Sequence, residues 1–244
     1  MRRKLTDNLK RVRDQIQDAC ARSGRRAEEV RLVAVTKTVE ADIIRAAVEI
    51  GLLDLGESRV QELVKRAGMI NEHLGRRRAM APEDTPPNPR WHMVGHLQRN
   101  KAGKAVRMFD MIQSVDSFRL AGELDKRGGE MGHTVDILVE VNTSGEESKY
   151  GMPPDGAIDL VGKISELPNL KILGLMTIGA FTDDESIVRK CFRTLRGIAE
   201  GVRRAGVPNA EMRYLSMGMT SDFEPAIEEG SNMVRIGTAI FGPR

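Results

Sequence analysis

The chain has 244 residues, of which 40% are hydrophobic and 30% are charged, and its formal net charge is +3 at pH 7. We therefore expect a core of apolar side chains under a charged surface, and a wholly disordered chain is excluded. Because the net charge is small and both signs are interspersed along the chain, we expect no nucleic-acid partner.

The sequence also argues against a membrane or secretory role. No apolar run approaches the roughly 20 residues that span a bilayer. The basic start Met1–Lys4 is followed by Leu5–Asn8 and not by the apolar stretch of a signal peptide, so we expect a cytoplasmic protein. Cys20 and Cys191 lie far apart without a metal-binding spacing, and we interpret them as reduced thiols.

The predicted elements alternate along the chain. A helix is predicted over residues 5–21, where apolar residues recur at spacings of three and four: Leu5, Leu9, Val12 and Ile16. Eight strand-like segments follow: Arg31–Lys37, Leu52–Gly56, Arg90–Gly95, Met108–Val115, Thr134–Asn142, Leu170–Ile178, Glu211–Met217 and Met233–Phe241. Amphipathic stretches between them predict helices: Ala41–Ile50, Val60–His73, Ser117–Met131, Asp155–Leu167, Asp184–Ala205 and Asp222–Glu229.

Strands that are separated by helices run parallel, because the crossover returns the chain to the same end of the sheet. Eight such units predict an α/β fold, a single (β/α)8 TIM barrel over residues 1–244 with an extra N-terminal helix. A doubly wound open sheet is the alternative. We expect a monomer, because no swapped domain follows the barrel.

One segment, Leu74–Arg90, is predicted to be a mobile loop. It contains Gly75 followed by the three arginines Arg76–Arg78, and then four prolines, which oppose both helix and strand. The arginines could bind phosphate or RNA, but a solvated loop is the preferred interpretation.

Lys37 is the main candidate for chemistry. Alternation along the first strand places Val33, Val35 and Lys37 on one face, with the lysine at the carboxyl end, where TIM barrels carry their active sites. Burial there would lower the pKa of the amine and free it to condense with an aldehyde. The alternative is a lysine whose ammonium group extends into solvent.

The last predicted strand adds a phosphate-binding pattern. In a closed barrel this strand lies beside the first one, so Arg235 and Lys37 would share one mouth. Gly237 allows an anion to approach backbone N–H groups, and Thr238 supplies a hydroxyl, in the region where barrels often bind phosphate. Ser216, at the end of the preceding strand, would join them.

Each of these residues also has a purely structural interpretation. Gly237 could turn the chain, Arg235 could neutralise a core carboxylate, and one of the residues Thr220, Ser221 and Asp222 could cap a helix. Their shared position on one rim favours a phosphorylated aldehyde as the ligand.

The same residues lie in segments that resemble the YggS/PROSC family of pyridoxal 5'-phosphate (PLP) homeostasis proteins. The matching segments run from the first strand to the C-terminus: Ala34–Thr38, Gly56–Glu62, Trp91–Lys101, Val141–Gly151, Gly174–Ile178, Leu215–Asp222 and Val234–Gly242. The resemblance implies a barrel like the N-terminal domain of alanine racemase.

The resemblance also implies the roles of individual residues. Lys37 would hold PLP covalently as a Schiff base, while Ser216, Gly237 and Thr238 would hold its phosphate. Arg235 would face the pyridine nitrogen, where a cation weakens the ring as an electron sink. Ser58 is a weaker candidate, because family members often carry Asn at this position.

The function implied is PLP homeostasis: the protein would hold and supply or buffer PLP, with apo PLP-dependent enzymes as recipients and no catalytic residue of its own. A PLP-dependent racemase of low activity is the alternative. Alanine racemases take a second proton-transfer tyrosine from a further domain, whereas this sequence ends at Gly242–Arg244, and neither Tyr150 nor Tyr214 is an obvious substitute. A third possibility is RNA or protein binding through Arg76–Arg78.

His92 is the last candidate, because it could line the cofactor pocket or be a satisfied core histidine. His92 and His96 are four residues apart, but the sequence places no third ligand near them, so no metal site is predicted.

Overall fold

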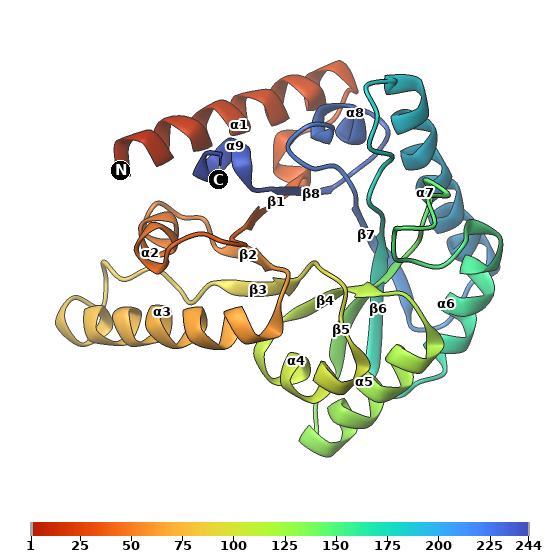
Figure 1. Ribbon diagram of the computed structural model, residues 1–244, viewed down its shortest axis with the longest axis horizontal. Helices are drawn as coiled ribbons and strands as arrows, with labels where there is room; N and C mark the ends of the chain where they lie inside the picture. The colour runs from red at the N-terminus through yellow and green to blue at the C-terminus, as the bar shows by residue number, and fades with distance from the viewer. Residues whose placement is uncertain (1, 244) are drawn as a thin grey trace.

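The computed structural model describes residues 2–243, and its centre is a barrel of eight parallel strands. The strands close in sequence order, so that β1 pairs with both β2 and β8, which confirms the predicted (β/α)8 barrel over the open sheet (Figure 1). Their bounds are β1 Arg31–Val35, β2 Asp54–Glu57, β3 Arg90–Met93, β4 Met111–Val115, β5 Val135–Glu140, β6 Leu170–Met176, β7 Ala210–Ser216 and β8 Met233–Ile236.

Helices surround the barrel. They are α1 Arg2–Arg22, α2 Ala41–Glu49, α3 Val60–Met80, α4 Ala102–Met108, α5 Phe118–Met131, α6 Ala157–Ser165, α7 Glu185–Ala205, α8 Phe223–Glu228 and α9 Thr238–Phe241, with short 3-10 turns at Ala27–Glu29, Arg99–Lys101 and Pro154–Gly156. The predicted N-terminal helix is confirmed as α1, which lies beside α8 and α9 where β1 meets β8 (Figure 1). Within residues 2–243 no helix is both long and apolar enough to cross a membrane.

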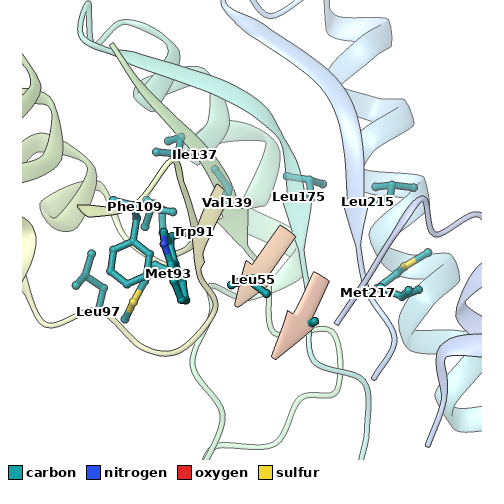
Figure 2. Close-up of a cluster of buried hydrophobic side chains, with 14 of the residues drawn as sticks. Leu55, Trp91, Met93, Leu97, Phe109, Ile137, Val139, Leu175, Leu215 and Met217 are labelled. Atoms are coloured by element: carbon teal, nitrogen blue, oxygen red, sulfur yellow. The ribbon is translucent and has the colours of Figure 1, made fainter. Parts of the chain in front are cut away.

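The main core fills the space between the strands and the helices. Side chains on the outer strand face, such as Leu55, Val139 and Leu215, point toward the helices, and Trp91 gathers with Phe109 and other residues beside β3 (Figure 2). A second, smaller apolar cluster lies inside the barrel: Val33, Met111, Leu138, Leu173, Met176 and Met233. Alternation along the strands therefore separates two layers, and several other inward positions carry the buried polar residues His92, Gln113, Glu140 and Arg235.

The structure corrects the predicted loop over Leu74–Arg90. Helix α3 continues to Met80, because Leu74 is buried and extends the apolar stripe of Leu63, Ala67 and Ile70. The three arginines lie in the last turns of this helix, where positive charge is favourable, and the prolines begin only after it ends.

Two other boundaries also differ from the predictions. Helix α4 was not predicted, although its Ala102, Ala105 and Val106 are buried on one face, and Met108 ends this helix instead of beginning a strand. The last predicted strand, Met233–Phe241, is a strand only to Ile236 and then becomes α9.

Candidate functional site

Lys37 lies in a turn just beyond β1, at the carboxyl end of the barrel. The strand ends at Val35, and Thr36, the next residue, is buried. The Thr36 N–H donates to Gly56 O at 2.8 Å, and the Thr36 carbonyl oxygen accepts from Val39 N at 2.9 Å. Thr38 follows with a left-handed φ of 66°. Lys37 is exposed, which corrects the expectation that burial would desolvate its amine. Because Lys37 lies in a turn and not in β1, the alternation of side chains along the strand does not determine where it points.

A buried carboxylate supports this turn from the neighbouring strand. Glu57, at the end of β2, accepts a hydrogen bond from the Thr36 hydroxyl at 3.2 Å and is paired with Arg66. Its other oxygen accepts from Ser58 N at 2.8 Å. Glu57 was not among the predicted site residues, although a glutamate at the end of a buried strand is a signal that the sequence contained.

Ser58 begins the loop after β2, where it lies against the loop after β3. A Cβ atom placed on Gly95 would come within 2.7 Å of Ser58 O, so only glycine fits there. Ser58 is therefore at the same end of the barrel as Lys37, on the adjacent strand exit.

Arg235 and Ser216 contact each other inside the barrel. Nη1 of Arg235 donates to the Ser216 hydroxyl at 2.7 Å, and Nη2 donates to Thr177 O at 2.8 Å. The Ser216 hydroxyl in turn donates to Gln113 Oε1 at 2.6 Å. Because the only proton of this hydroxyl is used there, Ser216 would have to redirect it to donate to a phosphate.

His92 continues the same set of hydrogen bonds. Its Nδ1 lies 3.0 Å from Gln113 Nε2, and its Nε2 lies 2.9 Å from Asp54 Oδ1. His92 is 1% exposed and both ring nitrogens have partners, which favours the interpretation as a satisfied core histidine. Gln113 and Asp54 were not predicted as site residues.

The electrostatics of this interior are unusual at two residues. Arg235 is buried, and desolvation lowers its pKa to about 10, against the opposing influence of Asp222 and Glu140. Burial, together with the charge of Asp116, raises the pKa of Glu140 to about 7, while Arg235 opposes the rise. Such shifts follow from placing charged groups in a medium of low dielectric constant.

Glu140 is also incompletely hydrogen-bonded. Its Oε2 atom is buried and has no hydrogen-bond partner within residues 2–243, and the same is true of the Ser114 hydroxyl. Buried polar atoms of this kind are rare in folded proteins and mark places where another group can complete the bonding.

The exit of β8 lies directly against the exit of β1. A Cβ atom on Gly237 would lie 3.3 Å from Val35 O, so a side chain there would crowd the neighbouring strand. Thr238 then starts α9, whose first N–H groups have no acceptor within the helix. Lys37, Gly237 and Thr238 are thus brought to adjacent strand exits, as the sequence suggested.

These residues fit a phosphorylated aromatic aldehyde. The mouth offers an amine at Lys37, N–H donors and a hydroxyl near Thr238, a buried cation at Arg235, and a buried Glu140 oxygen without a hydrogen-bond partner among residues 2–243. Together they provide one group for the aldehyde, one for the phosphate and one for the ring.

His96, Tyr150 and Tyr214 make other contacts. His96 stacks on Tyr150 with ring centroids 3.7 Å apart, and its Nδ1 lies 3.3 Å from Asp116. Tyr214 lies under the Arg31 guanidinium at the opposite end of the barrel. Over the described part of the chain, no group of three or more His, Cys, Asp or Glu residues is arranged to hold a metal ion.

The closed barrel and the groups at its carboxyl end define a protein of the alanine racemase barrel class. Consistent with this, the family described as "Alanine racemase, N-terminal domain" matches residues 8–244.

The chain belongs to the family of pyridoxal phosphate homeostasis proteins. It is 39% identical to the pyridoxal phosphate homeostasis protein of Aquifex aeolicus, over 98% of this chain and 97% of the relative. Among solved structures it is similar to an unknown protein from Bifidobacterium adolescentis, with 42% identity and a TM-score of 0.91 over 98% of this chain and 95% of the other. It is also similar to PipY of Synechococcus elongatus with PLP bound, with 33% identity and a TM-score of 0.76 over 88% of this chain and 93% of PipY.

Proposed function

We propose that this chain binds PLP covalently on Lys37 and takes part in vitamin B6 homeostasis by holding and supplying PLP. The observation that carries the proposal is the placement of Lys37 beside the Gly237–Thr238 turn on adjacent strand exits. The PLP-bound structure of PipY, which is similar in fold and sequence over 88% of this chain, supports the choice of PLP over other phosphorylated aldehydes.

Lys37 would attach the cofactor by a reversible condensation. The Nζ amine is the group that would condense with the aldehyde of the cofactor, with loss of water, and hydrolysis would reverse this attachment. When bound, PLP supplies a reactive aldehyde and an electron-withdrawing ring. The turn at Thr36–Thr38 orients the amine, because its backbone is fixed to β2 through Gly56.

The phosphate and the ring would be held by the other predicted residues. Thr238 and the N–H groups at the start of α9 would bind the phosphate, and Arg235 would face the pyridine nitrogen. A cation at that position disfavours protonation of the ring and so disfavours carbanion chemistry, which supports a carrier over a catalyst. His92 would support the site through its contact with Gln113, and Ser58 would support it from the loop after β2.

Catalysis is not part of the proposal. An alanine-racemase-type mechanism uses a tyrosine on the far face of the cofactor, whereas Tyr150 is stacked on His96 and Tyr214 lies at the opposite end of the barrel. We propose a cytoplasmic, monomeric protein in which residues 1–244 act as one PLP-binding unit, and apo PLP-dependent enzymes receive the cofactor.

Nucleic-acid binding through the three arginines is also not proposed. Arg76 is paired with Glu72, Arg77 lies 3.1 Å from Glu49, and Arg78 donates to Asn88 at 3.2 Å. Arg76 and Arg77 are thus paired with carboxylates of the chain, and the Arg78 guanidinium donates to a neutral amide.

The test is the visible spectrum of the purified protein after incubation with PLP and desalting, before and after borohydride reduction. Wild type should carry a yellow band that shifts on reduction, and Lys37→Ala should lack it. Lys104→Ala, which changes an exposed lysine on α4, is the matched control and should keep the band. A wild-type protein without a band, or a Lys37→Ala protein that retains it, would overturn the proposal.

A further inference from the structure

A pocket of about 700 Å³ opens at the amino-terminal end of the barrel, opposite to Lys37. It lies between α1, the turn at Ala27–Glu29 and the first residues of β1, β2 and β3. Its polar and aromatic lining includes Arg31, Asp54, Arg90 and Tyr214, and its apolar lining includes Leu32 and Leu52. The pocket plays no part in the proposed binding of PLP.

Positive side chains outnumber negative ones at the base of this pocket. Asp54 Oδ2 lies 2.8 Å from Arg90, and Asp54 Oδ1 lies 3.9 Å from Arg31. Two guanidinium groups therefore share one carboxylate, which leaves one positive charge in excess. On the rim, Arg13 and Glu28 carry opposite charges, and Glu29 is paired with Arg26 and lies 3.7 Å from Arg25.

The geometry of the two guanidinium groups suits a carboxylate. The Arg31 guanidinium lies over the Tyr214 ring, 5.0 Å from its centroid, and the Arg90 side chain is 51% exposed and can turn toward a ligand. Planar guanidinium groups bind carboxylates through two parallel hydrogen bonds. The leucine walls then favour a ligand with a short apolar body.

Asp54 is also the end of a hydrogen-bond chain that leads to Arg235. Along this chain every donor points the same way: Arg235 donates to Ser216, Ser216 to Gln113, Gln113 to His92, and His92 to Asp54. The direction of the chain is set at Gln113. Because the Gln113 carbonyl oxygen accepts the Ser216 proton, the NH2 group of Gln113 faces His92 Nδ1 and donates to it. A chain of aligned donors that ends on an anion is cooperative, because each bond polarises the next.

We propose that this pocket binds a small organic carboxylate, and that the bound ligand tightens the hold of the opposite mouth on PLP through His92 and Gln113. The second half of this proposal rests on the proposed function. A ligand carboxylate would draw Arg90 and Arg31 away from Asp54, and Asp54 would then accept more strongly from His92. The chain would in this way fix Ser216 and Arg235 more firmly in place.

Binding can be measured without PLP. Isothermal titration calorimetry of the PLP-free protein measures this binding directly. We expect the probe 3-phenylpropionate to bind wild type saturably and to bind Arg90→Met at least tenfold more weakly. The uncharged 3-phenylpropanol should not bind to wild type. Arg76→Met, an exposed arginine on α3, is the matched control and should bind like wild type. Equal binding of the alcohol, or unchanged binding by Arg90→Met, would overturn the site.

Coupling is measured as the PLP dissociation constant with and without saturating 3-phenylpropionate. We expect about fivefold tighter PLP binding with the probe, within the usual range of allosteric coupling. His92→Leu should bind the probe and lose this effect, and Gln113→Met serves the same purpose if His92→Leu does not fold. An effect that persists in both variants, or no effect in wild type, would overturn the coupling. A failure of the proposed function would appear separately, as the absence of PLP binding without the probe.

Discussion

The two ends of the barrel compensate their charged side chains in different ways. At the amino-terminal end, Arg90 and Arg31 both lie near the Asp54 carboxylate. Burial alone would raise the pKa of this carboxyl, but His92 and Arg90 hold it below its usual value. Toward the carboxyl end Arg235 and Glu140 are 4% and 3% exposed, and neither forms an ion pair with any residue in the range 2–243.

This difference supports the proposal that the cofactor binds at the mouth next to Lys37. A protein that only needed to fold would pair or remove two buried charges, because each costs several kcal/mol when it is taken out of water. Incompletely satisfied groups concentrate at functional sites, where a ligand completes them. The mouth next to Lys37 has this character at buried groups, whereas at the base of the barrel the excess charge is carried by the partly exposed Arg90 and Arg31.

Among the variants that test this comparison, we expect the largest change in the free energy of unfolding from substitution of Glu140. Its pKa of about 7 in the folded protein exceeds the ordinary value of 4.5, so its stabilising contribution is present below pH 4.5 and is lost as the pH rises through 7. Glu140→Gln should therefore raise the free energy of unfolding at pH 8 by about 3 kcal/mol and leave it nearly unchanged at pH 4. Urea unfolding of the PLP-free proteins at both pH values measures this, and an equal effect at pH 4 and pH 8 would refute the assignment.

A smaller effect is expected when the buried cation is removed. Arg235→Met should weaken PLP binding by about 30-fold, because a charge-assisted hydrogen bond contributes roughly 2 kcal/mol. Arg189→Met removes an arginine from the ion pairs between α7 and α8 and is the matched control, for which PLP affinity should stay within twofold of wild type. Equal losses of affinity in the two variants would show that Arg235 acts only through the fold.

The smallest effect is expected on the exposed surface of α3. Arg76 and Glu72 form a pair whose side chains are 75% and 63% exposed. Because solvent screens such pairs, Arg76→Ala should change the free energy of unfolding by less than about 0.5 kcal/mol and leave PLP binding unchanged. Thermal unfolding and a PLP titration of the variant check this, and a change in PLP affinity would instead connect this helix to the site.

Much of the fold could be read from the sequence, because the alternation of β-branched runs with amphipathic stretches specifies parallel strands and crossovers. Errors arose where local signals compete. Gly75 and the arginines after it resemble a loop, but the burial of Leu74 keeps α3 helical to Met80. Helix α4 has only seven residues, which is too short for a clear periodic pattern.

The placement of the candidate site residues was predictable where it depends on strand ends. Lys37, Gly237 and Thr238 follow short strands that a closed barrel must bring together. The interior hydrogen bonds were not predicted, since they depend on strand register and tilt. Gln113 and Glu140 are nevertheless polar residues in otherwise buried strands, and the inward parity that they share with Met111 and Leu138 was a signal in the sequence.

The central claim is that Lys37 is the residue that binds PLP covalently. The most direct measurement is borohydride reduction of the PLP-loaded protein, proteolysis and mass spectrometry of the peptides. The account requires the added mass of reduced pyridoxyl phosphate on the peptide that contains Lys37. The same mass on a different lysine, or no modified peptide at all, would contradict it.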